Sequence, residues 1–141
     1  MGCGVSKTGT HDDSVTESEK ESVALRLNFE AKEMEEAAKF DDARALYERA
    51  LELMRVSKGE SSVGYAVILS NMACLLRTET RYDEALQLFG EALVVIENSS
   101  DLTEDARYEM LETMRANALQ TEAWQNEEEL EILEFRATGH S

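Results

Sequence analysis

The chain has 141 residues, of which 43% are hydrophobic and 31% are charged, and its formal net charge is −16. This length and balance indicate one globular domain with a modest core and exclude a wholly disordered chain. The acidic charge disfavours nucleic-acid binding, which requires a basic surface, and no apolar run approaches the ~20 residues of a membrane-spanning helix.

The first seven residues, MGCGVSK, carry a pattern for lipid attachment. After removal of Met1, Gly2 and Ser6 fit the pattern for N-myristoylation, and the thiol of Cys3 is placed to accept a palmitate. One myristoyl chain gives only reversible membrane binding, so stable attachment requires the second chain. This start resembles that of dually acylated proteins such as Src-family kinases and G-protein α subunits. We therefore expect a lipid-anchored chain at the cytoplasmic face of a membrane, either the plasma membrane or a ciliary or flagellar membrane.

Residues 1–21 are polar, and we interpret them as a flexible, lipidated tether. Helical periodicity begins at Ser22 and meets no proline, so residues 22–135 are expected to form an all-α domain, followed by a tail at 136–141. Asp101 and Glu104 form a candidate capping box for the last helix. Loop and turn signals separate five expected helices, at about 22–38, 41–57, 63–79, 82–98 and 103–135.

Two of the expected helix pairs are similar to each other at an interval of 42 residues, the distance from Ala50 to Ala92. The segment FDDARALYERALEL at 40–53 matches YDEALQLFGEALVV at 82–95. Small residues recur where two helices must approach closely, and aromatic residues recur beside them and at the preceding turn. The residues assigned to this packing are Ala31, Phe40, Ala43, Tyr47, Ala50, Ala73, Tyr82, Ala85, Phe89 and Ala92.

This pattern of small and aromatic residues resembles the tetratricopeptide repeat, over about residues 27–98. The resemblance implies a short α-solenoid of antiparallel helix pairs, with repeats at about 22–57 and 63–98. The period of 42 residues is longer than the usual ~34, and the proline that normally ends the second helix is missing. Longer helices explain both departures. In this respect the chain is similar to kinesin light chains. Its segment LSNMACLL at 69–76 also resembles the Leu-x-Asn-x-Ala-x-Leu segment of that family.

The resemblance also implies a partner-binding groove on the first helix of each pair. In the kinesin light chain family the asparagine equivalent to Asn71 faces the groove and hydrogen-bonds the backbone of the partner; the alternative is an ordinary surface residue. The residues assigned to this groove are Asn28, Phe29, Lys32, Glu35, Ser70, Asn71, Cys74 and Arg77. The implied partner is a protein, bound as a peptide or a helix.

The last helix does not continue the repeat, and two interpretations of it stay open. It is expected to cap the open end of the solenoid, because two repeats alone rarely bury enough surface to fold. Alternatively, its apolar stripe meets a second chain, which would give self-association. The residues expected to pack inward are Tyr108, Leu111, Ala118, Leu119, Trp124, Leu130 and Leu133.

The residue pattern offers no catalytic chemistry. The histidines, His11 and His140, lie in the tails, so they cannot assemble a metal site or a catalytic triad. Cys74 has no neighbouring base and fits a packing position, and no glycine-rich phosphate loop is present. We expect neither an enzyme nor a cofactor nor a metal. The favoured function is an adaptor that holds a protein at a membrane, and the alternative is a structural component of a membrane-associated cytoskeleton. The excess of acidic residues either forms an ordinary solvated surface or complements the positive charge of a basic partner.

Overall fold

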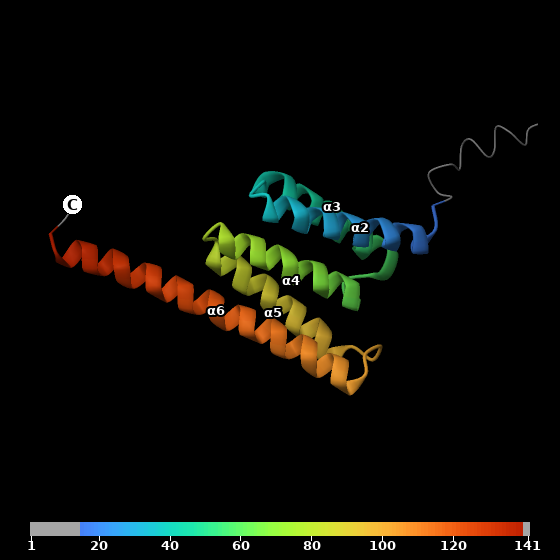
Figure 1. Ribbon diagram of the computed structural model, residues 1–141. Helices are drawn as coiled ribbons and strands as arrows, with labels where there is room; N and C mark the ends of the chain where they lie inside the picture. The colour runs from blue at the N-terminus through green and yellow to red at the C-terminus, as the bar shows by residue number, and fades with distance from the viewer. Residues whose placement is uncertain (1–14, 140–141) are drawn as a thin grey trace, which may run out of the picture. The chain divides into compact units, whose positions relative to one another are not determined.

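The computed structural model describes residues 15–139, and these contain five α-helices and no strand (Figure 1). The helices are α2 (Glu17–Glu36), α3 (Phe40–Lys58), α4 (Val63–Thr78), α5 (Tyr82–Asn98) and α6 (Glu104–Ala137). The prediction of an all-α fold of tetratricopeptide-like helix pairs is confirmed. Among residues 15–139, no helix combines the length and the apolar composition needed to cross a membrane. Gly2 and Cys3 lie outside the described residues.

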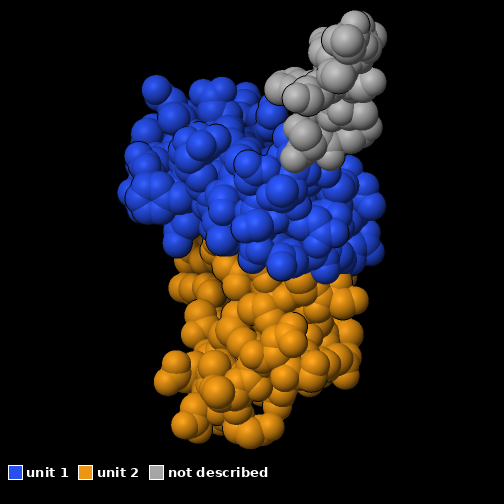
Figure 2. Space-filling view, turned by 90° about the vertical axis from the view of Figure 1, so that its right-hand side faces the viewer, with its two compact units in different colours: residues 1–60 blue, residues 61–141 orange. Residues whose placement is uncertain are grey.

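The chain divides into two compact units, residues 1–60 and residues 61–141 (Figure 2). The first unit contains the pair α2 and α3, joined by a short turn. The second contains the pair α4 and α5, followed by α6, which packs mainly on α5. Each unit therefore has one helix pair of the predicted repeat, and α6 adds to the second.

One helix begins earlier than predicted, and another begins where predicted but with a different cap. Helix α2 starts at Glu17, inside the predicted tether, because Thr16 and Glu19 form a capping box. The Thr16 backbone N–H donates to a Glu19 carboxylate oxygen at 2.7 Å, and this bond lowers the pKa of Glu19. The N-cap of α6 is Thr103, whose hydroxyl accepts a backbone hydrogen bond, so the predicted capping box at Asp101 is wrong.

The turn inside each helix pair has the same backbone geometry in both pairs. Ala38 has φ 60° and Thr80 has φ 63°, so a residue other than glycine is left-handed at the same place, 42 residues apart. In each turn the next backbone N–H donates to the carbonyl five residues earlier, at 2.8 Å after Ala38 and 2.9 Å after Thr80. This is the Schellman ending of a helix, which usually carries glycine at the left-handed position.

The predicted packing residues lie in the cores of the two pairs. Eight of them are at most 1% exposed: Ala31, Ala43, Tyr47, Ala50, Ala73, Ala85, Phe89 and Ala92. Phe40 and Tyr82, the other two, are half-buried first residues of α3 and α5. The alanines have no side chain beyond Cβ, so paired helices approach closely, and the aromatic rings fill the space beside them.

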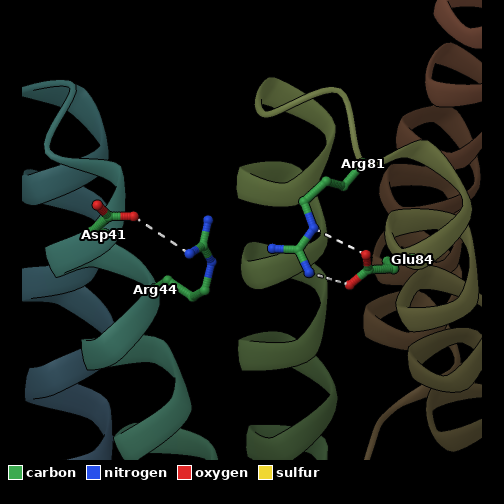
Figure 3. A network of polar contacts seen from close by, with 4 residues as sticks. All are labelled: Asp41, Arg44, Arg81 and Glu84. Carbon is green, nitrogen blue, oxygen red and sulfur yellow. Dashed lines mark hydrogen bonds and ion pairs between the residues drawn. The ribbon is translucent and has the colours of Figure 1, made fainter.

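The first turns of α3 and α5 have no side-chain cap. Each instead carries two acidic residues, which favour the positive end of the helix dipole. Each start also has an ion pair across one turn, drawn in Figure 3. Arg44 lies 3.4 Å from Asp41, whereas Arg81 makes two hydrogen bonds to Glu84, at 3.0 and 2.6 Å. Exposed pairs of this kind stabilise a helix by only about 0.3–0.5 kcal/mol.

Candidate functional site

A cavity of about 310 Å³, which we call the α4–α6 cleft, lies within the 61–141 unit. Its lining residues are Val67, Ser70 and Asn71 of α4, and Glu109, Met110, Thr113 and Met114 of α6. Two of the residues assigned to the partner-binding groove, Ser70 and Asn71, thus line the cleft.

Helical spacing explains why these side chains share the cleft. Ser70 and Asn71 follow Val67 by three and four residues, which places all three on one face of α4. Met110, Thr113 and Met114 have the same separation on α6. This second lining is absent from the predicted groove, although its spacing is visible in the sequence.

The cleft combines an apolar lining with a few polar groups. Met110 and Met114 are flexible and polarisable, so they can adapt to an apolar side chain of a partner. The amide of Asn71 carries both a donor and an acceptor, and the carboxylate of Glu109 favours a nearby positive charge. The volume is at the lower end of the ~300–1,000 Å³ typical of ligand sites and suits one or two side chains of a bound segment.

Arg77 has a different role from the predicted one. Its guanidinium donates to the backbone and side-chain oxygens of Asn117 at 3.3 and 3.2 Å, and to Gln120 at 3.4 Å. It also lies over the ring of Trp124, 4.9 Å from the centroid, in a cation–π contact. Arg77 therefore joins α4 to α6. The assignment of Arg77 as a groove residue needs this correction, because its hydrogen bonds are made within the unit.

Cys74 is half-buried on α4 and packs against a core cluster that includes Leu76 and Phe89. This position matches a packing residue at the edge of the core. Because its side chain packs against this cluster of α4 and α5 residues, its place in the partner-binding groove is not supported by this geometry.

The other four groove residues lie on α2, in the 1–60 unit. Phe29 is 63% exposed and Lys32 is exposed, whereas Asn28 and Glu35 are half-buried. The Tyr47 hydroxyl donates to Glu35 at 3.1 Å, so this carboxylate ties α2 to α3.

The middle of α6 makes an acidic surface beside α5. Tyr82, Trp124, Glu127, Glu128 and Glu131 line an open cavity there. Partial burial, followed by the negative charge of Glu128 and a hydrogen bond to it, raises the pKa of Tyr82. Three glutamates therefore share this cavity with the Tyr82 hydroxyl.

The C-terminal half of α6 does not pack as predicted. Leu130 and Leu133 are each 58% exposed, because this part of the helix runs past the ends of α4 and α5 (Figure 1). Tyr108 and Leu119, in the first half, are 64% and 65% exposed. The prediction that these residues face inward is wrong. Trp124 remains 38% exposed beside Arg77.

Only the inward-facing side of the first half of α6 is buried. Leu111 is 8% exposed and Ala118 packs against the core cluster, as predicted for both. Over residues 15–139, no group of His, Cys, Asp and Glu side chains is arranged to hold a metal ion.

Comparison with known protein families gives one match. Residues 33–97 match the family model described as "Tetratricopeptide repeat". The matched stretch runs from the last turn of α2 through α5, and so includes both left-handed turns. Neither the curated proteins nor the solved structures give a significant match. The match and the paired helices support a tetratricopeptide-repeat protein, while the likeness to kinesin light chains stays a prediction.

Proposed function

We propose that this chain is a lipid-anchored adaptor that holds a protein partner at the cytoplasmic face of a membrane. Tetratricopeptide repeats generally mediate protein–protein interaction, and this supports a protein partner in general. The α4–α6 cleft is the main observation behind the proposal. In it, the amide of Asn71, on the first helix of the second repeat, lies beside the apolar side chains of Met110 and Met114.

The cleft suits an extended or helical segment that inserts one apolar side chain. Met110 and Met114 would contact that side chain, while Asn71 would hydrogen-bond a polar group of the segment backbone. The carboxylate of Glu109 at the rim would favour a segment with a nearby Lys or Arg.

The lipid anchor rests on the N-terminal residues. Gly2 with Ser6 fits the myristoylation pattern, and Cys3 supplies the thiol for a second chain. Two acyl chains are needed because each buried methylene contributes about 0.8 kcal/mol, which makes a single myristoyl chain only marginally membrane-bound.

Partner capture tests the cleft. We expect Asn71→Ala combined with Thr113→Ala to weaken capture of the partner from detergent-solubilised membranes by tenfold or more in apparent Kd, roughly 1.4 kcal/mol. Asn98→Ala is the matched control, because Asn98 is an exposed asparagine of α5 whose side-chain amide donates to the Val94 carbonyl of its own helix at 3.0 Å. Equal capture by the double variant and the control would remove the cleft from the proposal.

Membrane fractionation tests the anchor. Gly2→Ala should abolish membrane association, whereas Cys3→Ser should leave weak, reversible binding, as expected for one acyl chain. Unchanged fractionation of Gly2→Ala would refute the anchor. The pull-down also separates the adaptor from the cytoskeletal alternative: one dominant soluble partner supports the adaptor, and retention in a detergent-resistant pellet supports a structural role.

A further inference from the structure

A second face of α6 carries a regular apolar stripe that the folded unit leaves exposed. The stripe, which we call the α6 seam, consists of Ala116, Leu119, Ala123, Asn126, Leu130 and Leu133. Its members follow one another at alternating steps of three and four residues, the heptad spacing of a helix that pairs with another helix. Leu119 is 65% exposed, and Leu130 and Leu133 are each 58% exposed.

The seam is distinct from the side of α6 that contacts the rest of the unit. The buried residues of α6 are Leu111, Met114 and Thr121, which belong to a different stripe. That stripe lies roughly 140° around the helix from the seam, because Leu111 and Ala116 are five residues apart at ~100° per residue. One face of α6 therefore packs on α5 while the seam faces outward.

Acidic residues border the seam on both sides. In the heptad register, one edge carries Glu122 and Glu129 with Arg115 and Arg136 at its two ends, and the other carries Glu127 and Glu134 with Gln120 at its start. Residues 122–137 contain six glutamates and one arginine. An oncoming helix would thus meet an apolar centre flanked by negative charge.

This charge pattern decides between two occupants. A second copy in parallel would place Glu122 opposite Glu127 and Glu129 opposite Glu134, which is repulsive at both of these contacts. An antiparallel copy aligned over the whole seam would pair Glu122 with Glu129 and Arg115 with Arg136, which is also unfavourable. A helix with an apolar stripe between Lys or Arg residues would instead make attractive pairs with the four edge glutamates.

We propose that the α6 seam docks a basic amphipathic helix of a partner protein. Leu119, Leu130 and Leu133 would supply the apolar contact, and the bordering glutamates would select a partner with Lys or Arg at its edges. Asn126, a polar residue at a central seam position, would fix the register of the pair. This surface is independent of both the α4–α6 cleft and the lipid anchor.

The test uses the full chain and synthetic three-heptad peptides. The main peptide has leucine at its seam positions and lysine at its edges. Two further peptides isolate the contributions: one keeps the leucines but has glutamate edges, and one keeps the lysines but has serine at the seam. Binding is measured by fluorescence anisotropy near neutral pH, and the oligomeric state of the chain by sedimentation.

We expect the lysine-edged leucine peptide to bind one-to-one and the other two to bind at least tenfold more weakly. Leu130→Ser combined with Leu133→Ser should weaken binding at least tenfold. Ile132→Ser is the matched control and should change the Kd less than twofold, because Ile132 is 45% exposed on the same part of α6 but outside the seam. Circular dichroism should show unchanged helicity for all variants.

Three results would overturn the proposal. Equal binding of the serine-seam peptide would show attraction by charge alone. Equal binding by the leucine variant and the control would place the contact elsewhere. A dimer near neutral pH that the leucine variant dissociates would make a second copy the occupant.

Discussion

Replacing Thr80 with glycine should stabilise the protein. Thr80 is left-handed at φ 63°, and this conformation costs an L-residue about 1–2 kcal/mol, with β-branched residues among the least tolerant. Glycine adopts the conformation without that cost but gains more freedom in the unfolded chain, which offsets about 0.5–1 kcal/mol. The backbone hydrogen bonds of the turn remain available, because none of them uses the threonine side chain. The expected net gain is about 0.5–1 kcal/mol in the free energy of unfolding.

Urea unfolding of the full chain, followed by far-UV circular dichroism, measures this gain. Thr78→Gly is the matched control, since Thr78 is the last residue of α4 and its hydroxyl donates to the Cys74 carbonyl at 3.1 Å. The same exchange should there destabilise the protein by about 0.5–1 kcal/mol, because glycine is a poor helix former. If Thr80→Gly destabilises as much as the control, the left-handed turn and the strain assigned to it are refuted.

Three further outcomes follow from the same structure. Gly90→Ala should stabilise the protein by about 0.5–1 kcal/mol in a urea titration, because Gly90 lies inside α5 with no atom within 4 Å of an added Cβ; a loss of stability would show that the site is not open. Ala92→Leu should destabilise by about 1–3 kcal/mol through overpacking of a fully buried position, while Glu48→Ser on the exposed side of α3 should be nearly neutral; similar thermal melts for both would contradict the packing register. Glu128→Gln should lower the pKa of Tyr82 toward its ordinary value in a spectrophotometric titration, since it removes a charge that favours the protonated hydroxyl; an unchanged titration would show that the charge of Glu128 does not contribute to the raised pKa.

The sequence predicted the helices well because each signal was local. The turns at Ala38 and Thr80, the loop before Val63 and the start of α5 at Tyr82 all coincide with predicted boundaries, to within about two residues. The buried alanines followed from their recurrence at 42 residues, which a chance amphipathic pattern would not reproduce. The early start of α2 was the main exception, since the Thr16 capping box lies in a polar stretch that lacks apolar periodicity.

The site was harder to predict because it depends on where α6 packs. The sequence identifies Ser70 and Asn71, but the position of α6 decides that Met110 and Thr113 complete the cleft. The same packing engages Arg77, which the resemblance to the tetratricopeptide repeat had placed in the partner-binding groove. The apolar residues in the second half of α6 likewise do not reveal from the sequence that α4 and α5 end before they can cover them.

The matching left-handed turns make the stretch between them an interchangeable module. A cut after Ala38 and a cut after Thr80 fall at the same point of the same turn, 42 residues apart. Removing residues 39–80 would join Ala38 directly to Arg81. This junction would have the same turn geometry as the two existing ones, so no new loop would be needed. Duplication of residues 39–80 would do the same in the other direction. The repeat number of such a chain can change by whole units without any new loop, a property that suits growth by internal duplication and gives protein engineers a ready splice point.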